Sequence, residues 1–174
     1  MKMFGKWRNE PESVPQEEAA FAGDIAPAKA GQPLIGEGRK ILVVDDNKVV
    51  LKAFELKMKN LGFTVLTALD GPAAVSCARH EKPDVIVLDI NFPPDVGSTG
   101  LQWDGFTILL WMRRFQDAAN IPVIIITSGD PSKFKDKAMT AGAVAFFQKP
   151  IDNEDFIMAL RRVVGQPVKN SKAA

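Results

Sequence analysis

Two short aliphatic segments that each end on aspartate constrain the fold of this chain more than any other feature of its sequence. ILVV at 41–44 is followed by Asp45 and Asp46, and VIVL at 85–88 is followed by Asp89 and, shortly after, by two prolines. A charged carboxylate beside buried apolar residues costs free energy unless it has a partner. We therefore expect these acids to lie at the tips of buried strands, where several polar groups meet.

Five strand-like segments alternate with helical patterns from Lys40 onward. Several are unbroken apolar runs, which are typical of parallel strands covered on both faces. The predicted strands are 41–44, 63–69, 84–88, 122–127 and 143–148, and the predicted helices are 47–61, 71–80, 105–118, 131–141 and 152–164. Because crossovers between parallel strands are right-handed, this order predicts an α/β fold, (βα)5, with a doubly wound five-stranded parallel sheet and helices on both faces.

The two ends of the chain differ in composition from this repeating part. Residues 1–38 mix Pro, Glu, Ala and Gly without a sustained apolar period, which is typical of a flexible arm. A second interpretation is that isolated apolar residues of this arm dock on the domain or on a partner. The sequence therefore predicts one domain at 39–165, preceded by a flexible N-terminal arm and followed by a disordered tail at 166–174.

Composition narrows the classes of function. The chain of 174 residues carries 22 basic and 21 acidic residues, a net charge of +1, which argues against a general nucleic-acid binder. The single cysteine, Cys77, fits a reducing compartment. No apolar run approaches the roughly 18 residues that cross a bilayer, and the first residues lack the apolar core of a signal peptide. We therefore expect a cytoplasmic protein that binds neither membrane nor nucleic acid.

The polar residues at the ends of the predicted strands suggest a chemistry. Open parallel sheets place their sites beyond the carboxyl ends of the strands, where Asp45, Asp46, Asp89, Thr127 and Lys149 all fall. Three neighbouring carboxylates repel one another unless they share a cation, and oxygen ligands of this kind suit Mg²⁺. A metal, a lysine and a hydroxyl together form a pocket for a phosphoryl group, which one of the carboxylates can attack.

Four motifs in order carry a resemblance to a known family. ILVVDDN, VIVLDINFPP, IITSGD and FFQKPI resemble, in sequence and spacing, the receiver domain of two-component response regulators, over about residues 39–165. The resemblance implies a flavodoxin-like receiver fold. It also implies that Asp89 is the phospho-acceptor, which receives a phosphoryl group from a histidine kinase or a phosphotransfer protein.

The family pattern also implies a set of metal ligands. Asp46 and Asp89 would bind Mg²⁺ directly, together with the backbone carbonyl of Asn91. Asp45 would hold a water bound to the metal. Lys149 would pair with Asp89 and later with the phosphoryl oxygens.

Further positions match residues that change conformation in this family between the unphosphorylated and the phosphorylated state. Thr127 resembles the hydroxyl that turns toward the phosphoryl group, and Phe146 the aromatic residue whose rotation accompanies phosphorylation. Ser128 matches a small residue that leaves room for phosphate access. Pro150 matches a position at which the preceding peptide bond is usually cis, a geometry that only proline adopts at low cost.

These residues together predict a single-domain response regulator that signals by changing its protein–protein contacts. Little chain follows Val164, so we expect no further output domain. The expected partners in this phosphorelay are a kinase or phosphotransfer protein upstream and a protein target downstream, with a homodimer as a further candidate. The resemblance places the output surface on the fourth and fifth helices and the fifth strand. Phosphoryl transfer and its reversal would be self-catalysed, so the chain is not expected to be an enzyme in the ordinary sense.

Two rival functions and one departure from the family pattern stay open. The rivals are a degenerate receiver that binds partners without phosphorylation and a Mg²⁺-dependent phosphohydrolase. Such hydrolases carry a second aspartate two residues after the nucleophile, where this chain has Asn91.

The departure from the family pattern is an apparent insertion at 94–103, which is either a tolerated surface loop or a segment that folds over the site through Leu101 and Trp103. The helical segment 106–115 is apolar on two faces, and the arm, this loop or a second subunit are candidates to cover the second face.

Overall fold

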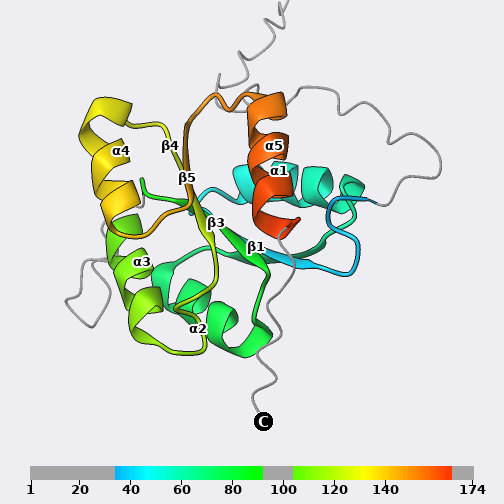
Figure 1. Cartoon of the computed structure of the whole chain (residues 1–174), viewed down its shortest axis with the longest axis horizontal. Helices are drawn as coiled ribbons and strands as arrows, with labels where there is room; N and C mark the ends of the chain where they lie inside the picture. Colours follow the sequence, from blue (N-terminus) through cyan, green and yellow to red (C-terminus); the bar gives the residue numbers. More distant parts are fainter. Residues whose placement is uncertain (1–33, 92–103, 166–174) are drawn as a thin grey trace, which may run out of the picture.

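The computed structural model describes residues 34–91 and 104–165, which form five parallel strands and five helices in alternation (Figure 1). The strands are β1 (Lys40–Val44), β2 (Thr64–Ala68), β3 (Val85–Asp89), β4 (Val123–Thr127) and β5 (Ala145–Gln148). The helices are α1 (Lys48–Asn60), α2 (Gly71–Glu81), α3 (Gly105–Arg114), α4 (Pro131–Thr140) and α5 (Asn153–Val164). The sheet has the order β2-β1-β3-β4-β5, and all of its pairings are parallel. The predicted doubly wound (βα)5 fold is confirmed.

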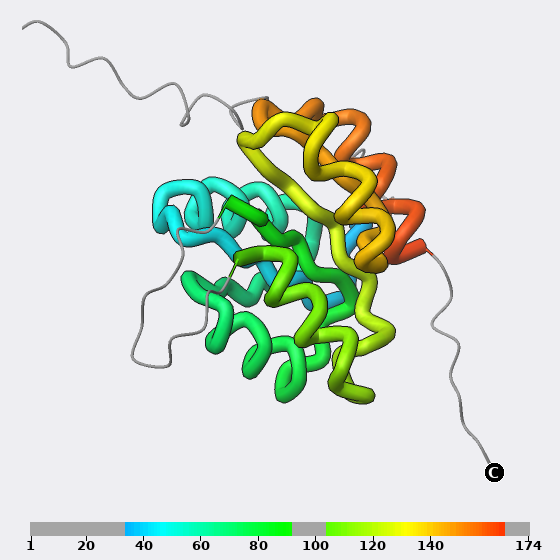
Figure 2. The backbone as a smooth tube through the Cα atoms, turned by 90° about the vertical axis from the view of Figure 1, so that its left-hand side faces the viewer, coloured from blue at the N-terminus to red at the C-terminus, as the bar shows by residue number. Residues whose placement is uncertain are grey.

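Two apolar layers cover the sheet, one on each face. Ile41 and Val43 of β1 pack in a core with α1 and α5, whereas Leu42 and Val44 pack with α2, α3 and α4. Figures 1 and 2 show the same division, with α1 and α5 above the sheet and α2 and α3 on its other side. Because successive side chains of a strand point to opposite faces, a strand buried on both sides must be aliphatic throughout. This explains the unbroken ILVV, VIVL and VIII runs.

Helix α1 shows how local signals set the bounds of a helix. The Asn47 side chain accepts hydrogen bonds from the backbone N–H groups of Val49 and Val50 and so caps the first turn. Gly62 follows the last turn with φ of +91°, a conformation that glycine adopts at low cost. The predicted stop at this glycine is confirmed. Leu51, Phe54 and Met58 form the buried apolar stripe of α1, and the half-buried Val50 packs against the same core.

Helix α3 is shorter than its apolar pattern predicted. It was expected to run to residue 118 but ends at Arg114, because Phe115 has extended backbone with φ of −95° and ψ of 121°. The Arg113 guanidinium donates to the carbonyl oxygens of Ala119 and Ile121 at 2.6 and 2.9 Å, and so holds the chain that turns back toward β4. The buried Ala118 therefore packs from this turn and not from the helix.

The contact between the N-terminal segment and the domain begins before the predicted boundary. Residues 34–38 were assigned to the arm, but Gly36 donates to the Leu61 carbonyl at 2.9 Å, and Arg39 donates to the Gly36 carbonyl at 2.9 Å. Ile35 packs against the core on the α1 side. Residues 1–33 of the arm, the tail at 166–174 and the insertion at 94–103 lie outside the described residues.

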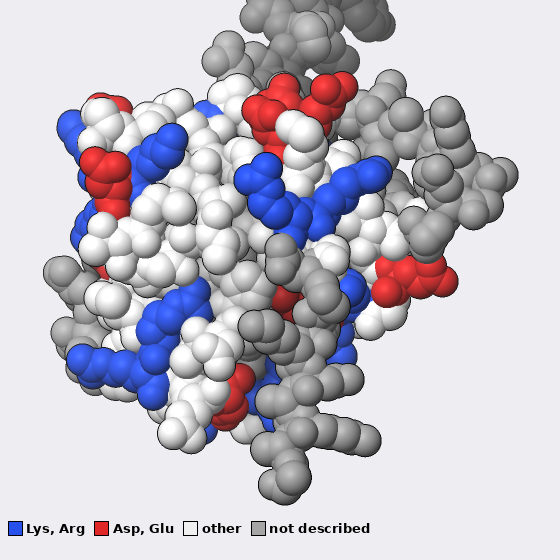
Figure 3. Space-filling view, viewed as in Figure 1, with Lys and Arg blue, Asp and Glu red and all other residues white. Residues whose placement is uncertain are grey.

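Two further observations on the described part of the chain concern the charges on its surface and the length and polarity of its helices. On the face shown in Figure 3, basic and acidic side chains are interspersed, and neither sign covers that face continuously. Within residues 34–91 and 104–165, every helix is too short or too polar to span a bilayer.

Candidate functional site

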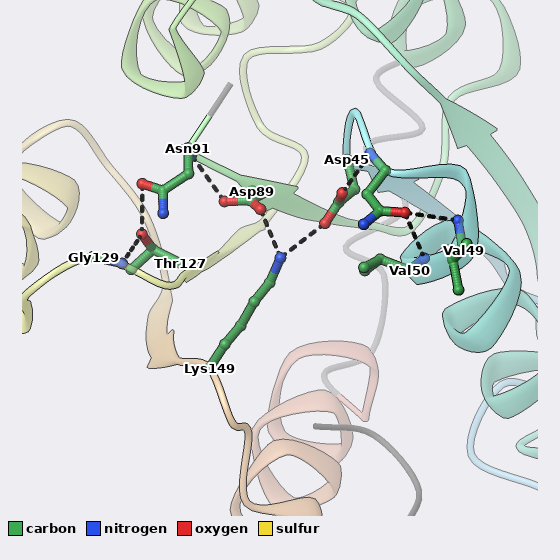
Figure 4. A network of polar contacts seen from close by, with 9 residues as sticks. Asp45, Val49, Val50, Asp89, Asn91, Thr127, Gly129 and Lys149 are labelled. Carbon is green, nitrogen blue, oxygen red and sulfur yellow. Dashed lines mark hydrogen bonds and ion pairs between the residues drawn. The ribbon is translucent and has the colours of Figure 1, made fainter. Parts of the chain in front are cut away.

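Four neighbouring strands bring the predicted site residues to one edge of the sheet. Asp45 directly follows β1, Asp89 and Thr127 are the last residues of β3 and β4, and Lys149 directly follows β5. Since these strands are parallel and adjacent, their carboxyl ends lie at the same edge. Figure 4 shows the side chains of Asp45, Asp89 and Lys149 pointing toward one another there.

The centre of the site is a buried cluster of two carboxylates and one ammonium group. The Lys149 Nζ atom lies 2.9 Å from Asp45 Oδ2 and 2.6 Å from Asp89 Oδ2. Asp45 is 1% exposed and Asp89 is 4% exposed. Ion pairs at such depth are stable only where the charges are paired closely, and a single lysine here serves two acids.

Burial and unequal charge shift the ionisation of this cluster. Burial raises the pKa of Asp45 to about 6 and the negative charge of Asp89 adds to this rise, although Lys149 and the Asn47 N–H group act in the opposite direction. Burial alone would lower the pKa of the Lys149 ammonium, but the neighbouring Asp89 and Asp45 carboxylates raise it above its usual value. The cluster therefore carries more negative charge than its lysine neutralises.

Backbone N–H groups orient both acids. The Asn47 N–H donates to Asp45 Oδ1 and the Asn91 N–H donates to Asp89 Oδ1, each at 2.8 Å. In both cases the donor stands two residues after the acid. The role of Asn47, which also caps α1, was missed by the sequence reasoning. An asparagine directly before a helical apolar period was the available signal.

Thr127 belongs to a second polar group beside the cluster. Its side chain is fully buried, and its Oγ1 atom lies 3.0 Å from the Asn91 side-chain amide. The Gly129 N–H donates to the same Oγ1 atom at 2.9 Å. In Figure 4 the Thr127 hydroxyl points toward Asn91, while Lys149 lies between the two acids. The hydrogen bond between the Asn91 amide and Thr127 is a second contact that sequence reasoning did not identify.

The predicted metal ligands are brought together only in part. Asp45 and Asp89 converge, whereas the Asp46 side chain is exposed and lies outside the lysine cluster. Among residues 34–91 and 104–165, no three His, Cys, Asp or Glu side chains are grouped as a metal site. The Asp45 and Asp89 carboxylates carry more negative charge than Lys149 neutralises, and such oxygen donors nevertheless suit Mg²⁺, because this ion needs few protein ligands and keeps its waters. The residues present therefore fit the ion.

The remaining predicted positions lie around the same edge. Phe146 is half-buried, lies opposite Ile125 in the pairing of β4 and β5, and packs on the core that α2, α3 and α4 share. Ser128 is exposed next to the site. The Lys149–Pro150 peptide bond is cis, as expected.

Fold and site together define an α/β domain with an acid–lysine cluster at the carboxyl edge of a parallel sheet. The family model described as "Response regulator receiver domain" matches residues 41–161. The chain therefore belongs to the response regulator receiver domain family. Receiver domains are signalling modules of two-component systems, where they interact with histidine kinases and downstream targets, and they are not classical enzymes.

Curated relatives agree with this assignment. The chain is 35% identical over 124 residues to the response regulator PleD of Caulobacter vibrioides, a match that covers 71% of this chain and 25% of PleD. It is 32% identical over 125 residues to the protein PilH of Pseudomonas aeruginosa, which covers 72% of this chain and 97% of PilH. The chain thus spans a quarter of PleD and nearly all of PilH.

Solved structures show the same fold. The chemotaxis protein CheY4 of Vibrio cholerae superposes with a TM-score of 0.63 at 26% identity, over 72% of this chain and 98% of CheY4. The receiver domain of the sensor histidine kinase PA1611 of Pseudomonas aeruginosa superposes with a TM-score of 0.62 at 25% identity, over 73% of this chain and 98% of that domain. That domain has a magnesium ion coordinated in its active-site cleft.

Proposed function

We propose that this chain is a response regulator whose Asp89 accepts a phosphoryl group from a histidine kinase or a phosphotransfer protein. The observation that carries this proposal is the buried cluster in which Lys149 bridges Asp89 and Asp45 at 2.6 and 2.9 Å. A carboxylate that is held by a backbone N–H and faced by an ammonium group is oriented for attack. It is also stabilised as an anion in a partly water-excluded place.

The chemistry assigns a separate task to each group. A carboxylate oxygen of Asp89 forms a bond to phosphorus while the bond between phosphorus and the donor histidine nitrogen breaks, and that nitrogen keeps the electron pair. The Lys149 ammonium holds the Asp89 carboxylate and neutralises charge on the phosphoryl oxygens. Mg²⁺, when bound, supplies further positive charge to those oxygens, and the Asp46 and Asp89 carboxylates and the Asn91 carbonyl are the ligands that would hold it, with Asp45 beside them.

The proposed output is a change in the protein surface. Thr127 and Phe146 would turn inward when Asp89 is phosphorylated, and the surface of α4, β5 and α5 would then select a partner. Three large apolar residues that are exposed on this surface support the assignment: Met139 on α4, Val144 directly before β5, and Met158 on α5. A downstream protein target or a second copy of the chain are the partners that such a surface suits. The match with PilH covers 97% of that protein at 32% identity, which supports a receiver domain as a unit that signals by itself. We place this unit in the cytoplasm as part of the same proposal.

Phosphorylation with defined controls tests this proposal. The purified chain is incubated with Mg²⁺ and either a small phosphodonor or each of a panel of phosphorylated histidine kinases, and its intact mass is measured. We expect one phosphoryl group on the parent chain and on Asp136→Asn, a matched change of an exposed acid on α4, and none on Asp89→Asn.

Two outcomes would contradict the proposal. One is the absence of phosphoryl incorporation with every donor in the presence of Mg²⁺, which would favour a degenerate receiver. The other is continued incorporation in Asp89→Asn. Rapid turnover of a chromogenic phosphate ester by the parent chain would instead indicate a phosphohydrolase.

A further inference from the structure

The Asn91 side chain holds the Thr127 hydroxyl in its resting position, and this side chain has no role in the proposed phosphoryl transfer. Thr127 is 0% exposed, so its hydroxyl must find its partners within the protein. Those partners are the Asn91 side-chain amide at 3.0 Å and the Gly129 N–H at 2.9 Å (Figure 4). Neither of these two groups belongs to the Lys149 cluster, toward which the hydroxyl would turn when Asp89 is phosphorylated.

The Asn91 amide contacts the hydroxyl in either of its two orientations. With its oxygen toward Thr127, it accepts a hydrogen bond from the hydroxyl. With the amide turned by half a rotation, its nitrogen donates to Thr127 Oγ1 at 3.0 Å, and its oxygen accepts from the N–H groups of Ser128 and Gly129 at 3.2 Å each. The second orientation satisfies more groups and also ties the strand that carries Thr127 to the loop after β3.

The other side of the hydroxyl is closely packed. A Cβ atom at Gly129 would lie 2.6 Å from Phe134 Cε2 and 3.2 Å from Thr127 Oγ1. Glycine at this position therefore lets a backbone N–H approach the hydroxyl while Phe134 of α4 packs behind it. The ring of Phe134 in turn packs against Phe106 of α3, with ring centroids 6.1 Å apart. The resting position is thus defined from two sides.

We propose that the Asn91 side chain is a positioning residue that holds the Thr127 hydroxyl in the unphosphorylated state and competes with the phosphoryl group for it. This inference rests on the proposed function, in which Thr127 turns toward phosphorylated Asp89. Phosphorylation must then break the bond between Asn91 and Thr127, so the amide raises the proportion of resting molecules. Its backbone carbonyl, the expected metal ligand, is a separate group of the same residue.

The size of the effect follows from the net contribution of one hydrogen bond. Loss of such a bond in the resting state shifts a two-state equilibrium by about two- to tenfold. Asn91→Ala should therefore raise the affinity of the chain for beryllofluoride with Mg²⁺, a stable analogue of the phosphoryl group, by about two- to tenfold. Alanine keeps the backbone carbonyl, and the affinity for Mg²⁺ alone is measured separately.

A double-mutant cycle separates this role from a direct effect on the phosphoryl pocket. The affinity for beryllofluoride with Mg²⁺ is compared for Asn91→Ala in the parent chain and in Thr127→Val, which has no hydroxyl to hold. We expect the gain only in the parent background. Asn60→Ala, at the exposed end of α1, is the matched control and should change nothing. An equal gain in both backgrounds, or no gain in the parent, would overturn the inference.

A second measurement needs no phosphoryl chemistry. Three-bond couplings report the χ1 rotamer of Thr127 by NMR, and hydrogen exchange reports the protection of the Gly129 amide. We expect Asn91→Ala to populate further Thr127 rotamers and to speed exchange at Gly129, and Asn60→Ala to do neither. Unchanged rotamers and exchange in Asn91→Ala would refute the holding contact. Failure of the parent chain to bind beryllofluoride, combined with the expected NMR changes, would refute the proposed function and leave the contact established.

Discussion

Lys149→Met removes the ammonium group that Asp45 and Asp89 share and leaves both carboxylates buried. The methionine side chain has a similar length, so the change removes charge and hydrogen bonds more than volume. The lysine lies 2.9 and 2.6 Å from the two carboxylate oxygens, which are 1% and 4% exposed by residue. Removal of one partner from a buried pair of this kind destabilises a protein by about 3–5 kcal/mol. We expect the free energy of unfolding of Lys149→Met to be lower than that of the parent chain by this amount at pH 8.

The loss of stability in Lys149→Met should depend on pH, because protonation of Asp45 removes the negative charge that Lys149 neutralises. The pKa of Asp45 in the folded chain is about 6, above its ordinary value of 3.8. An acid whose folded pKa is raised binds its proton more tightly in the folded state, so stability falls as the pH rises through this interval. Without Lys149 the pKa of Asp45 rises further. The deficit of the variant should therefore be largest near pH 8 and shrink toward pH 5.

Urea unfolding at pH 5 and pH 8, followed by tryptophan fluorescence, measures this difference. Lys133→Met, an exposed lysine on α4, is the matched control and should lie within about 0.5 kcal/mol of the parent chain. Mg²⁺ should restore part of the stability of the variant at pH 8, because an ion that binds the folded state stabilises it. An equal deficit at both pH values would refute the reasoning, since it would show that Lys149 acts through packing.

Three further changes test other parts of the structure. Burial lowers the pKa of Lys57, which donates to Asn153 Oδ1, to about 8, although the Asp152 carboxylate acts in the opposite direction. The stability of the parent chain should therefore rise between pH 8 and 10.5, and Lys57→Met should abolish this rise in urea titrations. Gly105→Ala places a Cβ atom 2.4 Å from the Ile90 Cα atom and should cost about 1–3 kcal/mol, measured by thermal unfolding. Lys82 has φ of +50° at the end of α2, so Lys82→Gly should stabilise the chain by about 1 kcal/mol in the same assay.

Opposite results would contradict each account. A Lys57→Met variant that keeps the rise between pH 8 and 10.5 would assign that rise to other groups. An unchanged melting temperature in Gly105→Ala would show that the start of α3 and the end of β3 separate easily. A lower melting temperature in Lys82→Gly would show that the lysine side chain contributes more than the backbone strain costs.

The strands and the strand-end site could be predicted from the sequence because both depend on short-range patterns. An aliphatic run buried on both faces predicts a parallel strand, and parallel neighbours bring their last residues to one edge. Asp45, Asp89, Thr127 and Lys149 follow from that rule without any knowledge of side-chain geometry. The Asp104 cap of α3 and the stop of α1 at Gly62 follow from equally local signals.

The features that could not be predicted depend on contacts between distant segments. Helix α3 was extended too far because Phe115 and Ala118 continue its apolar period. In the structure, carbonyl groups beyond the helix are bound by Arg113, a contact that no period reveals. The Asn91 amide meets Thr127 across 36 residues of sequence, and the two acids share one lysine from the far end of the domain. Such polar contacts are set by loop geometry, which only the assembled sheet defines.

The site of phosphorylation is the measurement that tests the central claim most directly. The chain is incubated with Mg²⁺ and a phosphodonor, the acyl phosphate is reduced with borohydride, and the modified residue is located by peptide mass spectrometry. Reduction converts a phosphorylated aspartate to homoserine. The account predicts homoserine at position 89 and an unmodified residue at positions 45 and 46. Modification at another aspartate, with Asp89 intact, would contradict it.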